Sequence, residues 1–226
     1  MKNEISITRP FGPTLLQVQL PQQIIDDLNT DCEEIAAGKN KKIDWSEHLA
    51  GKVKEEYLIS DAVLAKHSRW FVEMAGRYAF PNEEDFKKAQ QDHDIMFQSG
   101  WYVRQYADDF NPKHHHTNCN MSCVGYLKMP EDIEKHWKEE EKDHNPAGGA
   151  IEFSYGVTGF NCPNNIRFKP TVGEFFLFPH FLDHQVYPFK SKYLFPDPKG
   201  ERRSFSLNII LQKRGHQEQL NDRKNK

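Results

Sequence analysis

The sequence predicts a mainly β fold, a barrel or sandwich of short strands flanked by helices. Two observations carry this prediction: apolar residues recur at helical spacing between residues 22 and 91, and short strand-like segments follow one another from residue 95 to residue 211. With 226 residues, the chain can bury a substantial core in one domain, and no internal repeat or Gly/Ser-rich linker divides it. We therefore expect one domain over residues 1–226, composed of an N-terminal strand and helical support (1–95), a β core (96–211) and a polar tail (212–226).

The N-terminal elements follow from local patterns. Residues 14–20 have strand character, and Pro21 separates them from a helix predicted over 22–37. Apolar side chains near helical spacing support that helix: Ile24, Ile25, Leu28 and Ile35. A second helix is predicted over 61–79 and a short third one over 84–91.

The β core is predicted from a series of apolar or alternating segments. They cover residues 96–106, 121–128, 150–155, 166–169, 174–179, 184–187 and 203–211. A charged segment, residues 130–146, interrupts the series, and we expect it to form an inserted surface helix or lid.

Composition excludes several classes of protein. The 16 Phe, 8 Tyr and 4 Trp residues argue against disorder, and a net charge of −3 gives no electrostatic case for a nucleic-acid or anionic-membrane partner. No apolar run approaches the roughly 20 residues needed to cross a bilayer, and the first residues contain no apolar signal core. Because the cysteines form no CxxC pair, we expect free thiols and a cytoplasmic protein; the four are Cys32, Cys119, Cys123 and Cys162.

Three consecutive histidines suggest a metal site. On extended backbone, His114 and His116 project to the same face and can offer two imidazoles to one ion, whereas His115 points away. His184, which follows an apolar strand, is the candidate third ligand. Such a site leaves coordination positions open, which is typical of catalysis, and its ligands suit iron, zinc, copper or nickel. A solvated loop tip and an ordinary buried histidine are the alternative interpretations.

Polar and apolar residues alternate after residue 201, so Arg202 and Ser204 are expected on one face of a strand. A guanidinium beside a hydroxyl is a good clamp for a carboxylate, because Arg offers a fixed fork for two oxygens. A strand with one solvent-facing side explains the same alternation.

The order of these motifs resembles the Fe(II)/2-oxoglutarate-dependent oxygenase superfamily. It is most similar to the prolyl-4-hydroxylase-like branch and to a related group of oxygenases from bacteria and marine bacteriophages. The resemblance covers about residues 100–211 and implies a double-stranded β-helix core of the jelly-roll, cupin-like type with N-terminal helices packed on it. The segments that carry it are residues 106–116, 122–127, 148–153, 169–179 and 184–189, followed by Arg202-x-Ser204.

The resemblance implies roles for individual residues. His114 and His184 correspond to iron ligands, and Arg202, assisted by Ser204, corresponds to the partner of the distal 2-oxoglutarate carboxylate. Tyr106 and Tyr126 correspond to tyrosines that hydrogen-bond this cosubstrate; ordinary packing is the alternative role for both. The implied cofactor and cosubstrates are Fe(II), 2-oxoglutarate and O2, with ascorbate as an optional addition.

One position departs from the family pattern, which has Asp or Glu where this chain has His116. We expect His116 to be the third ligand of a three-histidine site. In the alternative, His116 stands aside and the position is filled by water, a halide or a carboxylate; the candidate carboxylates are Asp108, Asp109 and Asp183.

The expected activity is hydroxylation of an unidentified substrate with release of succinate and CO2. A protein or peptide residue such as proline is the first candidate substrate, and a small metabolite is the second. The segments 130–146 and 190–201 are candidates for loops that cover the site. Two alternatives stay open: a cupin-like three-histidine dioxygenase that does not use 2-oxoglutarate, and a non-catalytic binding barrel.

Overall fold

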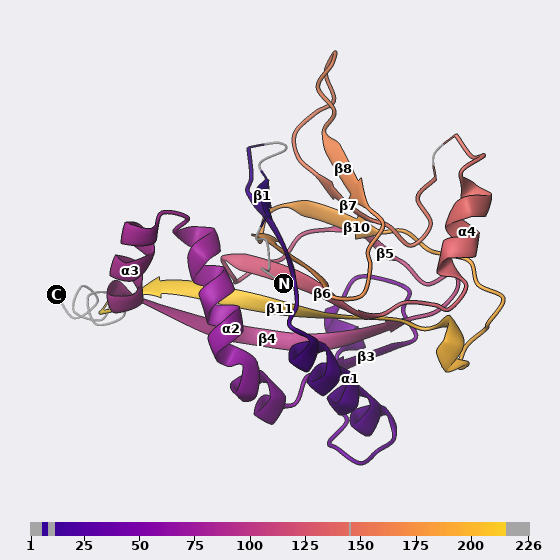
Figure 1. Ribbon diagram of the computed structural model, residues 1–226, viewed down its shortest axis with the longest axis horizontal. Helices are drawn as coiled ribbons and strands as arrows, with labels where there is room; N and C mark the ends of the chain where they lie inside the picture. Colours follow the sequence, from indigo (N-terminus) through magenta and orange to yellow (C-terminus); the bar gives the residue numbers. More distant parts are fainter. Residues whose placement is uncertain (1–5, 9–11, 145, 216–226) are drawn as a thin grey trace.

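The computed structural model describes residues 6–8, 12–144 and 146–215, and its core consists of two antiparallel sheets (Figure 1). The larger sheet has the strand order β1-β2-β9-β6-β11-β4-β3 and the smaller one β5-β10-β7-β8. The strands of the larger sheet are β1 (Ser6–Thr8), β2 (Leu15–Gln19), β3 (Glu55–Leu58), β4 (His93–Gln105), β6 (Met121–Lys128), β9 (Glu174–Pro179) and β11 (Arg202–Lys213). Those of the smaller sheet are β5 (Asn111–His114), β7 (Ile151–Ser154), β8 (Asn165–Phe168) and β10 (Asp183–Val186).

Helices cover the outer face of the larger sheet. In Figure 1, α2 (Asp61–Ala79) crosses in front of β4 and β11, α1 (Gln22–Ala36) lies below β4, and α3 (Glu83–Asp92) lies beside the far end of β11. A fourth helix, α4 (Ile133–Glu140), lies at the opposite end of the molecule (Figure 1). Two 3-10 turns complete the set, η1 (Ser46–His48) and η2 (Pro198–Gly200).

The alternation of side chains along the strands separates two apolar layers. On β6, Cys123 and Leu127 pack against α1 and α2, whereas Val124 and Tyr126 face the smaller sheet. The central strands β9 and β11 alternate in the same way, because successive residues of a strand point to opposite faces. A helix-facing core and an inter-sheet core result.

This architecture confirms the predicted mainly β fold, a jelly-roll core with N-terminal helices packed on it. The helices expected at 22–37, 61–79 and 84–91 are present within one residue of those limits. Strands β1 and β3 were not expected. The expected polar tail, residues 212–226, begins inside β11, and residues 216–226 lie outside the described part of the chain.

The segment predicted as an inserted helix contains α4, which is partly packed: Ile133 and His136 are buried. No helix in the described ranges combines the length and the apolar composition that a membrane span requires.

Candidate active site

A cavity of about 650 Å³ lies between the two sheets. Side chains from the inner face of β4, β6 and β11 form one wall, and residues of β5 and β10 form the opposite wall. Residues of the segment 45–50 also line it. Most residues predicted as site residues lie here: His114, His116, His184, Tyr126, Arg202 and Ser204.

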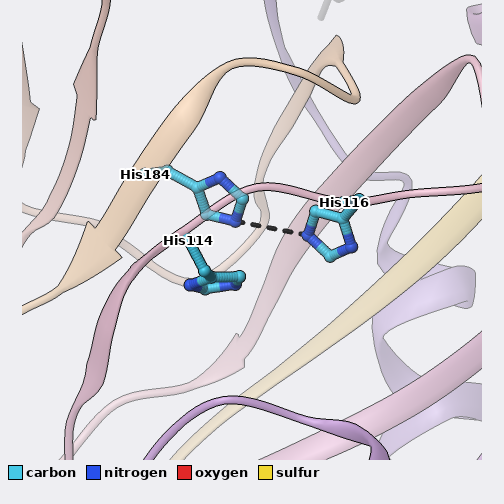
Figure 2. Close-up of side chains that lie close together, drawn as sticks. All are labelled: His114, His116 and His184. Atoms are coloured by element: carbon cyan, nitrogen blue, oxygen red, sulfur yellow. Dashed lines mark hydrogen bonds between the residues drawn. The ribbon is translucent and has the colours of Figure 1, made fainter.

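The three predicted histidine ligands converge in this cavity. One ring nitrogen of each of His114, His116 and His184 lies within 4.8 Å of the others. Nε2 of His116 is 3.3 Å from Nε2 of His184, and the two rings are nearly parallel, with an interplanar angle of 6° (Figure 2). The ring of His114 lies next to His184, with 4.3 Å between the ring centroids.

Backbone hydrogen bonds fix two of the imidazole rings. Nδ1 of His114 donates to the Pro112 carbonyl oxygen at 2.7 Å, and Nδ1 of His184 donates to the Leu182 carbonyl oxygen at 3.0 Å. Since a neutral imidazole has one donor and one acceptor nitrogen, these bonds leave Nε2 of both rings with a free lone pair. Such a second hydrogen bond is the usual way to orient a metal-binding histidine.

The three imidazoles are held neutral. Burial, followed by repulsion between the neighbouring imidazoles, lowers the pKa of His116 to about 3 and that of His184 well below its usual value. Burial also lowers the pKa of His114. A metal binds the neutral form of histidine, so the cluster is ready for coordination at neutral pH.

Strand pairing explains why residues 68 positions apart meet. His184 on β10 is the register partner of His114 on β5. Beyond the end of β5, the His116 amide donates to the His180 carbonyl oxygen at 2.9 Å, and Nδ1 of His180 donates to the His116 carbonyl oxygen at 3.0 Å. The middle residue, His115, is exposed, contacts Asp183 at 3.3 Å and is not part of the three-histidine cluster, although it also lines the cavity.

The carboxylates considered as alternative ligands lie elsewhere. Asp183 is 3.4 Å from Lys113 and 3.3 Å from His115. Asp109 is buried and accepts the Tyr106 amide at 2.9 Å. None of the three, Asp108 included, belongs to the histidine cluster. The geometry therefore favours His116 as the third ligand.

The donor set fits a divalent transition metal. Metal–imidazole bonds are about 2 Å long, so two nitrogens on one ion are about 3 Å apart, close to the 3.3 Å between His116 and His184. Nitrogen ligands suit iron, zinc, copper and nickel. The cysteines are free thiols outside this cluster, and burial raises the pKa of Cys119 to about 11.

Arg202 is a buried cation in the same cavity. Its side chain is 1% exposed; Nη1 donates to the Gly149 carbonyl oxygen at 2.6 Å and Nη2 donates to Gln105. Its Nε has no hydrogen-bond partner, and no Asp or Glu among the described residues forms an ion pair with it. Burial without a counter-ion lowers the pKa of Arg202 to about 10. A buried charge of this kind is costly unless a ligand completes it.

Two further predicted residues accompany Arg202. The Tyr126 hydroxyl is buried without a hydrogen-bond partner, and Ser204 lies two residues along β11 on the same face. Burial raises the pKa of Tyr126, so the hydroxyl stays protonated and can donate. Arg202 Nε and Tyr126 Oη are therefore unused donors beside one cavity.

The structure does not bring Tyr106 to this group. Its hydroxyl accepts from Nη2 of Arg104 at 3.2 Å, on the helix-facing side of β4, and Tyr106 does not line the cavity. Strand alternation instead directs Gln105 inward, where it accepts from Arg202 and donates to Asn111 at 2.7 Å. Sequence reasoning missed Gln105; the parity shared with the strand partner Arg202 is the signal that points to it.

Comparisons with known proteins agree with this geometry. Residues 99–208 match the family model described as "Putative 2OG-Fe(II) oxygenase". A crystal structure of a Pseudomonas putida prolyl-4-hydroxylase superposes with a TM-score of 0.51 and 14% identity, covering 95% of each chain. The non-heme alpha-ketoglutarate-dependent carbocyclase SnoK from nogalamycin biosynthesis gives a TM-score of 0.53 and 9% identity, covering 86% of this chain and 79% of SnoK. A search of curated protein sequences gives no match.

The jelly-roll fold and the three-histidine cluster between its sheets are compatible with an oxygenase of the non-haem metal type. Over residues 99–208, about half of its length, the chain is similar to the 2OG-Fe(II) oxygenases.

Proposed function

We propose that this protein is a dioxygenase that couples oxidation of 2-oxoglutarate to hydroxylation of a second substrate. The observation that carries the proposal is the pairing, in one cavity, of a neutral three-histidine cluster with a buried arginine that has no counter-ion. A three-histidine dioxygenase that binds its substrate directly needs only the first of these features.

In this proposal, His114, His116 and His184 hold Fe(II) through their Nε2 atoms. Arg202 binds the distal carboxylate of 2-oxoglutarate, and Tyr126 and Ser204 donate hydrogen bonds to it. When bound, the metal and 2-oxoglutarate supply the oxidising chemistry, which yields succinate and CO2 and transfers one oxygen atom of O2 to the substrate. The chain's own contribution is to orient the carboxylate-binding donors of Arg202, Tyr126 and Ser204, to hold the imidazoles neutral and to exclude bulk water from the space between the sheets.

The fold does not choose the substrate. One neighbour of similar TM-score is a prolyl-4-hydroxylase, and another is a carbocyclase from antibiotic biosynthesis. A peptide residue such as proline remains our first candidate and a small metabolite our second, because similar sites on one fold act on different molecules.

The proposal is tested by 2-oxoglutarate binding and turnover in the iron-loaded protein. We expect succinate release in the presence of 2-oxoglutarate, O2 and ascorbate. Arg202→Ala is expected to weaken 2-oxoglutarate binding at least about thirtyfold, because it removes one partner of a buried charge pair, while metal content is retained. Arg214→Ala, the same change at an exposed arginine of the β11 end, is the matched control and should bind 2-oxoglutarate like wild type.

Absence of both 2-oxoglutarate binding and succinate release in the iron-loaded protein would contradict the proposal. Metal-dependent oxidation that is indifferent to 2-oxoglutarate would identify the three-histidine dioxygenase instead. Equal loss of metal and 2-oxoglutarate in Arg202→Ala would show that the role assigned to Arg202 is wrong.

A further inference from the structure

Glu56 lies on the cavity wall, and the proposed function assigns it no role. It is on β3, the edge strand of the larger sheet, and its register partner on β4 is Val103. Val103 and the next partner across the sheet, Ser204, face the cavity. Because residues opposite one another on paired strands share a face, Glu56 faces inward with them, and it does line the cavity.

One oxygen of the Glu56 carboxylate is buried without a hydrogen-bond partner. The side chain is 4% exposed, and its Oε1 atom has no hydrogen bond. The other buried carboxylates of the described chain all have donors. Tyr102 donates to Asp31, the Tyr106 amide to Asp109, Arg167 to Glu152, and Arg104 and Arg203 to Glu201. Glu56 is thus the exception among acids whose desolvation is otherwise compensated.

No ion pair joins the two charged side chains of the cavity, and Glu56 Oε1 and Arg202 Nε both lack a hydrogen-bond partner. Glu56 is the one carboxylate and Arg202 the one arginine among the described residues that line the cavity. Strand β4 lies between β11 and β3, and strands are about 4.8 Å apart, so the two backbones are about 10 Å apart. Each charge is therefore available to a different ligand group.

The surroundings of Glu56 favour a cation. Burial, together with the neighbouring carboxylates Asp44 and Asp109, raises its pKa to about 7, so a positive group would relieve an unfavourable local potential. The aromatic side chains Trp45 and Trp101 line the same cavity, and indole faces attract organic cations. The polar lining and the volume of about 650 Å³ suit a flexible, hydrophilic molecule.

We propose that Glu56 selects a cationic substrate, by pairing with an ammonium or guanidinium group while Arg202 takes the anionic cosubstrate. The two charges then sort two ligands of opposite sign within one cavity, which also disfavours an anionic molecule in the substrate position. One part of the inference rests on the proposed function, namely that the bound cation is a substrate; the binding of a cation by Glu56 does not depend on it.

The test is binding of a charge-matched series of probes to the full, metal-free chain. The probes are the Nα-acetyl methylamides of L-lysine, L-arginine, L-norleucine and L-glutamate, which share a backbone and differ in the side-chain charge. Calorimetry and quenching of tryptophan fluorescence report binding, the latter because Trp45 and Trp101 line the cavity. We expect the lysine and arginine probes to bind about tenfold to hundredfold more tightly than the norleucine probe, and the glutamate probe to bind least.

The matched variants are Glu56→Gln and Glu84→Gln. Glu56→Gln keeps the size of the side chain and removes its charge, and we expect the preference for the cationic probes to disappear. Glu84 is exposed on α3, outside the cavity, so the same change there should leave the preference intact. Thermal unfolding monitors whether each variant is folded.

Equal affinity for the lysine and norleucine probes, or no measurable binding of any probe, would overturn the inference without requiring a variant. A cation preference that survives in Glu56→Gln would overturn it too. These results are independent of 2-oxoglutarate binding by the iron-loaded protein, so failure of the proposed function is recognised separately.

Discussion

At the residue scale, the site lacks the one negatively charged ligand of the family pattern that the sequence resembles. An imidazole, His116, stands where the family that the sequence resembles has a carboxylate, and the structure places it within 3.3 Å of His184. If the three histidines bind a divalent ion, these neutral ligands would leave its full positive charge on the centre, which would strengthen its attraction for an anionic cosubstrate and change its redox potential.

The contribution of His116 is tested by two substitutions. His116→Ala is expected to weaken metal binding at least about a hundredfold, since loss of even an outer-shell partner costs tenfold to a hundredfold. His116→Asp is expected to retain metal, because it restores a carboxylate at the ligand position. Metal titration of both variants checks this; an alanine variant with wild-type metal affinity would mean that His116 stands aside.

Glu56 makes stability depend on pH in a defined direction. Its pKa in the folded protein is about 7, above the ordinary value of 4.5, so folding is disfavoured once the unfolded chain ionises and the folded chain does not. Relative to Glu56→Gln, wild type should lose stability from about pH 4.5 to pH 7 and level off above. At about 1.4 kcal/mol for each pH unit, the loss over these 2.5 units is about 3 to 4 kcal/mol.

Urea unfolding of both proteins at pH 4.5, 6 and 8 measures this difference. Taking the difference between the two proteins cancels the buried histidines, whose lowered pKa values act on both alike. Parallel pH profiles for wild type and Glu56→Gln would show that burial of this carboxylate carries no penalty.

At the element scale, α4 supports the cosubstrate position. Nε1 of Trp137 donates to the Gly148 carbonyl oxygen at 2.7 Å, and Glu140 accepts the Gly148 amide at 2.9 Å. The next carbonyl, that of Gly149, accepts from Arg202. Gly149 has a φ of 69°, a left-handed conformation that glycine adopts without strain. The helix thus fixes a turn that orients the arginine.

Trp137→Phe tests this support. It keeps an aromatic ring and removes the indole N–H, so a net loss of about 1 kcal/mol in positioning is expected, seen as a severalfold weaker affinity for 2-oxoglutarate. Metal affinity should be unchanged, because the histidines belong to β5, its following loop and β10. Loss of metal together with 2-oxoglutarate would indicate general disruption instead.

Sequence patterns predicted long elements and missed short edge strands. The limits of α2 and β6 coincide with the predicted ones, because their apolar spacing is unambiguous over many residues. Strand β3 was missed because Glu55 and Glu56 resemble a solvated surface pair; only pairing with β4 turns Glu56 inward. The histidines and Arg202 were identified from the sequence. That Gln105 faces the cavity and Tyr106 does not depends on how β4 pairs with β11, which only the fold supplies.

At the scale of the whole molecule, β11 contributes side chains to both faces of the larger sheet. Arg202 faces the cavity, while its neighbour Arg203 faces the helices and is 1% exposed. Arg203 donates to Glu201 at 2.7 Å and to Asn29 of α1 at 2.9 Å. Adjacent arginines therefore divide two tasks: the ligand binding proposed for Arg202, and the attachment of the helical layer by Arg203.

Arg203→Ala is expected to separate these tasks. Removing one partner of a buried ion pair costs about 3 kcal/mol, so unfolding in urea should begin at lower concentration. The folded variant should bind 2-oxoglutarate like wild type, in contrast to Arg202→Ala. Comparable stability of the two variants would argue against this division.

The same alternation restricts which changes of length the chain can accept. Deleting one residue of β11 directly after Arg203 would exchange the faces of both arginines, directing Arg203 into the cavity and Arg202 towards α1. Single-residue insertions and deletions in this part of β11 should abolish activity. They should be tolerated in the exposed turn between β7 and β8, residues 155–164. A length-variant library scored for activity would thus outline the strands that the site depends on.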